Sequence, residues 1–259
     1  MIDTNPFAVL SDTVSPDLMQ IFVALMVVLV GAGTIVDLLH KKSARYFFES
    51  ARRNRGDRVL DTGEKAALAA KTVVVDWLAA GEFCNARRRL AHLLTMYGFL
   101  AYAVSTVVMV FGYPASDVET PALWPWLWHI GAVMICVGGY WFWFFIRVDV
   151  SAEGHSPFRV VRADLFILSL LANATLALVW SYLQASGSDW SNVGLGLYVL
   201  SALALFGSVP WSKFSHMFYK PAAAYQKRVE DANGSRANLP APADAASTLG
   251  SARTPPSHY

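Results

Sequence analysis

The 259-residue sequence contains little charge and almost no cysteine. Charged residues make up 15% of the chain and hydrophobic residues 55%, a balance too apolar for an ordinary water-soluble domain. The two cysteines, Cys84 and Cys136, form no C-x-x-C motif, so the sequence indicates neither an iron–sulfur cluster nor a zinc site. The short alternating segments of a membrane barrel are also missing. The composition therefore predicts an integral membrane protein built from helices.

Long apolar runs determine the predicted architecture. A bilayer core of roughly 30 Å requires about 20 residues of helix. Runs of about that length lie at 18–40, 90–112, 123–147, 164–184 and 194–218. We therefore expect an all-α integral membrane bundle of five transmembrane helices over residues 18–220. A short segment at 1–17 precedes it, and a tail at 221–259, rich in Ser, Pro, Asn and Ala towards its end, is predicted to be disordered.

The basic residues predict how the chain crosses the membrane. All 21 Lys and Arg residues fall on one side of the five spans, and the segment before the first span holds three aspartates and no basic residue. Because Lys and Arg accumulate on the cytoplasmic side, we expect the N-terminus outside and the C-terminus in the cytoplasm. The first span is longer than the apolar h-region of a signal peptide and is not closed by an A-x-A site, so we expect it to remain. The predicted location is the cytoplasmic membrane.

The loop at 41–88 is predicted to be cytoplasmic and contains an amphipathic stretch from Glu64 to Ala80. Its apolar residues recur at helical spacing, which predicts a helix on the inner membrane surface or against a partner. The arginines of this loop have two interpretations. They set the topology and bind anionic lipid head groups, or they form a docking surface for a protein.

Two histidines lie at the same predicted depth near the basic side. His92 follows three arginines at the start of the second span, and His216 lies near the end of the fifth. Two imidazoles facing each other inside a helical bundle can bind a haem iron from both sides. Gly98 and Gly207 are expected to leave space on the same helices for a flat macrocycle. Alternatively, both histidines hydrogen-bond lipid head groups or neighbouring side chains.

The sequences around these histidines resemble a known family. Residues 87–99 contain an arginine cluster, then His, then Gly-Phe, and residues 209–219 contain Pro-Trp-Ser-Lys-Phe-Ser-His. Both segments are similar to the five-helix cytochrome b subunit of respiratory nitrate reductase. They are closer to its relatives in sulfur metabolism: the membrane domain of the quinone-interacting membrane-bound oxidoreductase and the membrane anchor of adenylylsulfate reductase. The length, the five predicted spans and the absence of an attached iron–sulfur domain favour the anchor.

The resemblance implies one b-type haem with His92 and His216 as its axial ligands. In the nitrate reductase subunit, a second haem is held by one His ten residues further along span two and another eighteen residues earlier in span five. These positions are Tyr102 and Tyr198 here, so an outer haem is not expected. Eighteen residues make about five turns of a continuous helix, which would place Tyr198 on the same face as His216.

By this resemblance the chain is a non-catalytic subunit of an oxidoreductase complex. It would anchor a cytoplasmic iron–sulfur and flavin enzyme, adenylylsulfate reductase, and pass electrons to the membrane quinone pool. Besides this enzyme, the expected partners are quinone and membrane lipid, with no nucleic acid. Two other interpretations stay open: a haem-free docking scaffold with a quinone site, and a small-solute transporter, although the sequence shows no inverted repeat.

Polar residues inside the spans are candidates for a quinone site or a proton route, because such residues are costly in lipid and often functional. The candidates are His129, Asp37, Asn173, Tyr102 and Tyr198. Each can equally hydrogen-bond a neighbouring helix. His129 lies among three tryptophans at the outer end of its span, which is also typical of an interfacial aromatic belt.

Overall fold

The computed structural model describes residues 2–41, 58–81, 83, 85–147, 160–161, 164–211 and 216–235. The described residues form helices, turns and connections without a strand, which confirms the all-α class. The chain divides into two compact units. The first, here called the bundle, comprises Met1–Lys41 and Ala79–His216, and the second, called the small unit, comprises Lys42–Leu78 and Met217–Tyr259.

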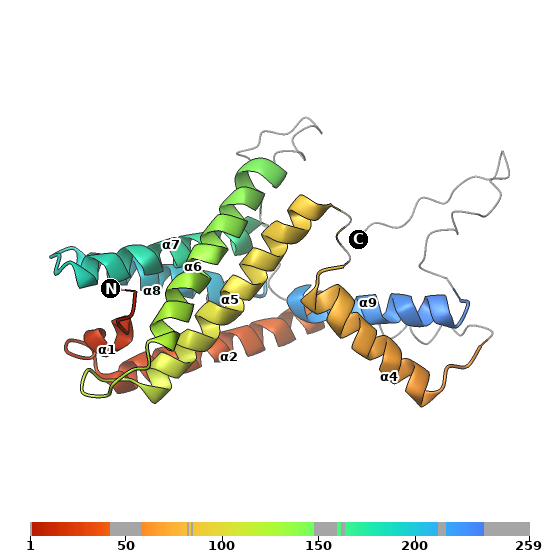
Figure 1. Ribbon diagram of the computed structural model, residues 1–259, viewed down its shortest axis with the longest axis horizontal. Coiled ribbons are helices and arrows are strands. Elements are labelled where there is room, and N and C mark those ends of the chain that lie inside the picture. The colour runs from red at the N-terminus through yellow and green to blue at the C-terminus, as the bar shows by residue number, and fades with distance from the viewer. Residues whose placement is uncertain are drawn as a thin grey trace. The chain divides into compact units, whose positions relative to one another are not determined.

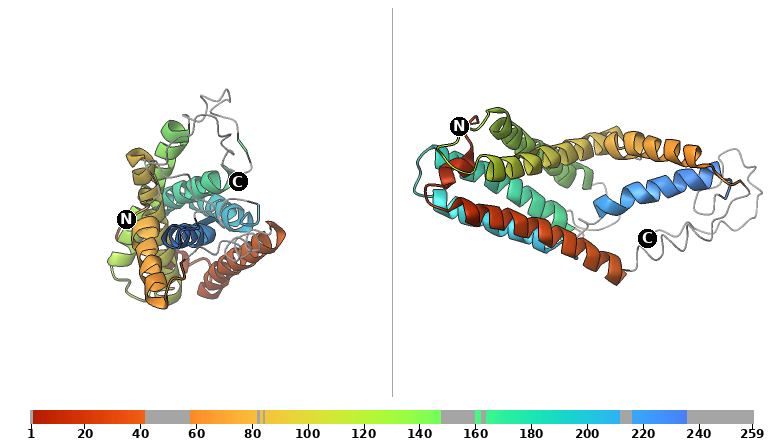
Figure 2. Two further views of the ribbon diagram at one scale, coloured as in Figure 1. Left: turned by 90° about the vertical axis from the view of Figure 1, so that its right-hand side faces the viewer. Right: turned by 90° about the horizontal axis from the view of Figure 1, so that it is seen from below.

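The bundle is a ring of long helices with one short helix at its end (Figures 1 and 2). Its helices are α1 (Pro6–Leu10), α2 (Pro16–Lys41), α5 (Ala86–Gly112), α6 (Leu123–Trp141), which continues as the π-helical segment η2 (Phe142–Ile146), α7 (Leu165–Ala185) and α8 (Ser191–Gly207). The closest pairs are α5 with α6 and α7 with α8; α6 also packs on α7, and α2 closes the ring by packing on α5 and α8. The short α1 lies against α5.

Four helices of the bundle are long and apolar enough to cross a membrane. They cover Pro16–Asp37, Ala86–Gly112, Leu123–Ile146 and Leu165–Ala185, with mean hydropathies between 1.6 and 2.4. These four helices coincide with the first four predicted spans. Their length and composition are those of a membrane protein.

The fifth predicted span, 194–218, is wrong in its second half. The apolar helix α8 has 17 residues and ends at Gly207, followed by a turn at 208–211. Pro210 has no backbone N–H and disfavours a helical conformation in the preceding residue, which explains this end. His216 begins a separate helix, α9 (His216–Ala232), so Tyr198 and His216 do not share a face of one continuous helix.

The small unit contains α4 (Thr62–Lys71), the π-helical η1 (Thr72–Leu78) and almost all of α9. Together α4 and η1 confirm the helix predicted around 64–80. At its start, the side chains of Asp61 and Glu64 each accept a hydrogen bond from the backbone N–H of the other residue. The prediction of a disordered tail from residue 221 is wrong as far as Ala232, because α9 is helical there. Arg228 in α9 donates two hydrogen bonds, of 2.7 and 2.9 Å, to the Asp76 carboxylate in η1, and these contacts hold that helix in place. Residues 236–259 lie outside the described part of the chain.

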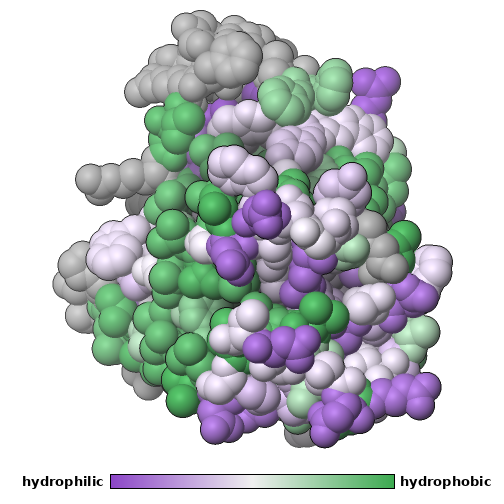
Figure 3. Space-filling view, turned by 90° about the vertical axis from the view of Figure 1, so that its left-hand side faces the viewer, coloured by the Kyte–Doolittle hydropathy of each residue, from purple (hydrophilic) through white to green (hydrophobic). Residues whose placement is uncertain are grey.

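Charged residues separate towards the two ends of the bundle. Figure 3 looks onto the end that carries α1 and the α5–α6 and α7–α8 connections, where hydrophilic residues lie among apolar ones. The exposed charged residues of these segments are all acidic: Asp3, Asp12, Asp17, Asp117, Glu119 and Asp189. The opposite ends of the same helices carry the described basic residues of the bundle, Lys41, Arg87, Arg88, Arg89 and Arg147. This separation agrees with the one-sided distribution in the sequence.

Helices α5 and α6 approach each other closely through glycine. A methyl group on Gly98 would lie 2.8 Å from the Gly131 carbonyl oxygen, and one on Gly138 would lie 2.7 Å from the Ala91 carbonyl oxygen. In membranes such small residues allow backbones to pack tightly, where no hydrophobic effect favours association. The interpretation of Gly98 as space for a macrocycle is therefore wrong, because α6 fills that space. Beside Gly207 no neighbouring atom of the described residues lies within 4 Å of the corresponding position.

We expect Gly131→Ala to destabilise the bundle. The added methyl group would lie 2.7 Å from both the Gly98 carbonyl oxygen and the Tyr102 backbone nitrogen, so the two helices must move apart. Overpacking of this kind costs about 1–3 kcal/mol. Gly196→Ala in α8 is the matched control, since nothing lies within 4 Å of its added methyl group. Thermal unfolding in detergent should show a lower midpoint for Gly131→Ala alone, and equal midpoints would contradict the close contact.

Candidate functional site

The predicted haem ligands are only partly described by the structure. His92 lies in α5 near the basic end of the bundle, is half-buried, and packs its ring 4.9 Å from the ring of Phe83. His216 begins α9, but its side chain lies outside the described residues. Within the described chain, no three His, Cys, Asp or Glu residues gather into a metal-binding group. The haem between His92 and His216 stays a prediction.

His129 in α6 is a buried residue that joins two helices. Its Nδ1 donates to the Pro125 carbonyl oxygen at 2.8 Å, and its Nε2 accepts from the Ser181 hydroxyl in α7 at 2.8 Å. A neutral imidazole has one donor and one acceptor, so both nitrogens are used. This geometry supports the alternative in which His129 hydrogen-bonds a neighbouring helix. The side chain is only 5% exposed, so it lies inside the bundle. A residue of an interfacial aromatic belt would instead be exposed on the surface of the bundle.

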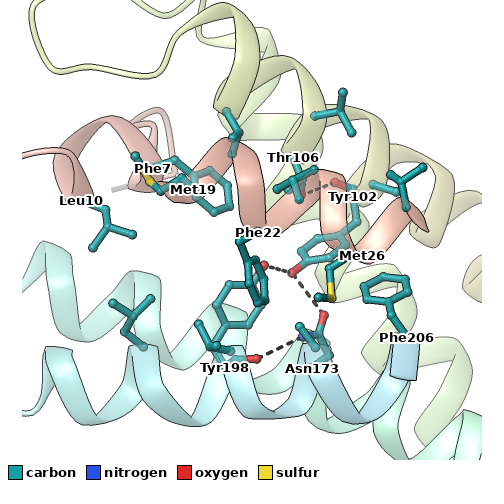
Figure 4. Close-up of a pocket in the computed structure, with 18 of the residues that line it drawn as sticks. Phe7, Leu10, Met19, Phe22, Met26, Tyr102, Thr106, Asn173, Tyr198 and Phe206 are labelled. Carbon is teal, nitrogen blue, oxygen red and sulfur yellow. Dashed lines mark hydrogen bonds between the residues drawn. The ribbon is translucent and has the colours of Figure 1, made fainter. Parts of the chain in front are cut away.

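An apolar cavity of about 460 Å³ lies between α2, α5 and α8, with α1 at one end (Figure 4). Phe22 and Met26 of α2 form one wall, and Tyr102 of α5 and Tyr198 of α8 face them. None of the described lining residues is charged. Its size is within the range of small-molecule sites, roughly 300–1,000 Å³. The lining admits an uncharged and largely apolar molecule.

Polar atoms gather at one corner of this cavity. The Tyr102 and Tyr198 hydroxyl groups are 2.7 Å apart and share a hydrogen bond. The Tyr102 hydroxyl also lies 3.4 Å from Oδ1 of Asn173 in α7. The Asn173 amide donates to the Ser201 hydroxyl at 3.1 Å and to the Tyr198 carbonyl oxygen at 3.4 Å. We call Tyr102, Tyr198, Asn173 and Ser201 the polar corner.

Buried aromatic rings fix the two tyrosines in place. Tyr102 stacks on Trp128 at 5.3 Å, and Tyr198 stacks on Trp180 at 5.4 Å, with ring planes only 10° apart in the second pair. Phe7 of α1 lies between the two tryptophans, 5.7 Å from each. The five rings and the Tyr102–Tyr198 hydrogen bond therefore form a closed circuit. This circuit leaves no space for a macrocycle between the two tyrosine side chains.

The structure brings together three of the five polar residues predicted for a quinone or proton site. Tyr102, Tyr198 and Asn173 meet at the polar corner, whereas His129 does not line the cavity. Asp37 is 2% exposed within α2 and also lies outside the cavity lining. Sequence reasoning missed Ser201, which completes the corner. Its position three residues after Tyr198, about one helical turn away, is the signal that could have found it.

The fold and the cavity define a class: an all-helical bundle of membrane type with a charge-free internal site. Comparison with protein families finds no matching family, and no solved structure matches the chain. The chain is similar to citrate utilization protein B of Escherichia coli, with 27% identity over 161 residues. The match covers 59% of this chain and 40% of that relative, so the chain spans less than half of the relative's length.

We expect His129→Leu to lower the free energy of unfolding by about 0.6–1.7 kcal/mol, because the buried Ser181 hydroxyl loses its partner. Ser181→Ala should have a cost of similar size, since it leaves His129 Nε2 without its donor. The double variant should cost less than the sum of the two single changes, since both disrupt one hydrogen bond. Denaturant unfolding of the four proteins in detergent measures this coupling. Strictly additive losses would contradict the His129–Ser181 bridge.

Proposed function

We propose that the chain is a membrane anchor and electron-transfer subunit. It links a cytoplasmic adenylylsulfate reductase, which would carry the iron–sulfur and flavin chemistry, to the quinone pool of the cytoplasmic membrane. The observation that carries this proposal is the charge-free cavity between α2, α5 and α8 with its single polar corner. The sequence resemblance at residues 87–99 and 209–219 supports the choice of partner.

The cavity favours a membrane-soluble redox carrier over a polar solute. A small charged metabolite would need compensating charges or several polar partners, because burying a charge without them is very costly. Among the described lining residues, hydroxyl and amide groups occur at the polar corner and at Thr106, whose hydroxyl already bonds Trp128 and the Tyr102 carbonyl oxygen. The name of the relative concerns citrate utilization, but the residues described around this cavity include no basic side chain that could bind a tricarboxylate. A transporter for such solutes is therefore the weaker interpretation.

The separation of charge favours a partner at one end of the bundle. Arg87, Arg88 and Arg89 begin α5, and Arg147 follows η2 at the same end. A basic surface recruits an acidic partner by electrostatic steering. If this end faces the cytoplasm, as the distribution of basic residues predicts, the soluble enzyme binds there.

The proposed haem would be held by His92 and His216 at the same end. A haem with two axial histidines supplies one-electron transfer between the docked enzyme and the membrane. His92 contributes a half-buried imidazole packed on Phe83. In the haem-free alternative the chain is still an anchor with a quinone site in the cavity. In that case His92 only packs on Phe83 and binds no iron.

A reduced-minus-oxidised spectrum of the purified protein tests the haem. We expect a b-type absorption that disappears in both His92→Ala and His216→Ala, because a bis-histidine iron needs both ligands. His258→Ala, a change close to the C-terminus of the sequence, is the control and should keep the absorption. A wild-type protein without this absorption would leave the haem-free anchor as the function.

Charge reversal tests the anchor. Arg52, Arg53 and Arg55 belong to the loop on the predicted docking side. These three arginines lie outside the described residues. We expect the triple change to Glu to weaken co-purification with adenylylsulfate reductase by about tenfold or more at low salt, and salt to weaken the wild-type complex as well. Reversal of the acidic residues Asp117 and Glu119 to Lys is the control at the other end. Binding that is indifferent to salt and to the triple change would contradict a basic docking face.

A further inference from the structure

We infer that the cavity between α2, α5 and α8 binds the head group of an isoprenoid quinone, with the tyrosine pair donating a hydrogen bond to one quinone carbonyl oxygen. The isoprenoid tail lies along the apolar wall of α2. This inference rests on the proposed function, since it assigns a position to the quinone that the anchor would serve.

The chemistry of the lining selects the ligand class. Of the described residues around the cavity, only Tyr102, Thr106, Asn173 and Tyr198 carry polar side-chain atoms, and none is charged. Thr106 already accepts a hydrogen bond from Trp128 Nε1 at 3.0 Å. The ligand is therefore uncharged, mostly apolar and able to accept a hydrogen bond at one point. A quinone has this composition, with carbonyl acceptors on an apolar ring and an apolar tail.

Counting protons at the polar corner shows which hydrogen bond a ligand can replace. The two phenol groups have two protons, and one of these occupies the 2.7 Å bond between them. If Tyr102 donates to Tyr198, the Tyr198 proton has no further acceptor among the described residues. If Tyr198 donates, the Tyr102 proton is left with Asn173 Oδ1 at 3.4 Å, close to the outer limit of a hydrogen bond.

Asn173 favours the second arrangement, because its Oδ1 accepts from the Tyr102 hydroxyl. Its amide group donates to Ser201 and to the Tyr198 carbonyl oxygen, and Ser201 in turn donates to the same carbonyl oxygen at 2.6 Å. Asn173 is thus held in place, and its 3.4 Å bond with Tyr102 is the longest link in the chain of hydroxyl groups. A ligand carbonyl oxygen beside Tyr102 can replace this long bond with a shorter one.

Depth distinguishes a quinone from a phospholipid chain. Tyr102 lies roughly 24 Å along α5 from Ala86 and 15 Å from Gly112, so it is in the middle part of the helix. A phospholipid keeps its carbonyl groups at the head-group level, and only hydrocarbon reaches this depth. Hydrocarbon fits the walls but offers the tyrosine pair no acceptor. A quinone head group can enter the hydrocarbon region and supply one.

Tryptophan fluorescence can report the binding directly, because Trp128 and Trp180 stack on the two tyrosines and a quinone ring nearby quenches them. The full chain, purified and placed in phospholipid nanodiscs without quinone, is titrated with a decyl-substituted benzoquinone. We expect saturable quenching in the wild type. Tyr198→Phe and Tyr102→Phe should bind about five- to tenfold more weakly, which is the loss of one hydrogen bond.

Tyr140→Phe is the matched control. It removes the same hydroxyl group from α6, where Tyr140 is exposed and bonds Thr175, outside the cavity. Decylbenzene is the matched ligand, since it has the ring and the tail without carbonyl groups, and its own dissociation constant, measured by competition, should be equal in wild type and Tyr198→Phe. Unfolding midpoints of all variants show that the bundle is intact.

Two results would overturn the inference. One is equal quinone affinity in the Tyr198, Tyr102 and Tyr140 variants. The other is quenching by a bromine-labelled phospholipid that the quinone cannot displace, which would assign the cavity to lipid. Neither result bears on the haem spectrum or on co-purification with the reductase, so failure of this site is distinguishable from failure of the anchor.

Discussion

The hydrogen bond between Tyr102 and Tyr198 joins the two halves of the bundle. One half is the close pair of α5 and α6, and the other is the close pair of α7 and α8. On one side these pairs meet where α6 packs on α7, and on the other side the two hydroxyl groups meet at 2.7 Å beside α2. The stacked tryptophans and Phe7 are placed by the same bond, since each tyrosine ring rests on one of the tryptophans.

The bundle obtains its stability from tight contacts more than from individual polar bonds. A hydrogen bond between membrane helices contributes only about 0.6 kcal/mol on average, because the separated helices also find partners. Glycines in the α5–α6 interface bring backbone atoms into direct contact. The bridges at His129 and at the polar corner then fix the rotation of each helix about its axis.

The apolar runs in the sequence predict the helices well, because each span is determined by its own composition. The first four predicted spans match α2, α5, α6 with η2, and α7 within a few residues. The fifth predicted span continues past Gly207 to residue 218, whereas the structure ends α8 at Gly207, three residues before Pro210. The site was harder to predict. That Tyr102, Tyr198 and Asn173 meet depends on how three helices rotate against each other, and no spacing within one helix contains that information.

His129 illustrates the same limit. Its neighbours in the sequence are tryptophans, a pattern typical of a membrane surface, and its partner Ser181 lies 52 positions away in α7. Only the pairing of α6 with α7 shows that the ring is internal. The haem ligands His92 and His216 depend on the resemblance alone, because the side chain of His216 lies outside the described residues.

The early end of α8 has a consequence for the surrounding lipid. With 17 residues, α8 extends about 25 Å, while α5 with 27 residues extends about 40 Å. A bilayer that contains both helices meets a hydrophobic mismatch on one flank of the protein: it thins beside α8, or α5 tilts until its apolar length fits. Either response costs fractions of a kcal/mol per ångström of mismatch. Membrane thickness therefore affects the side of the bundle where α2 and α8 enclose the cavity.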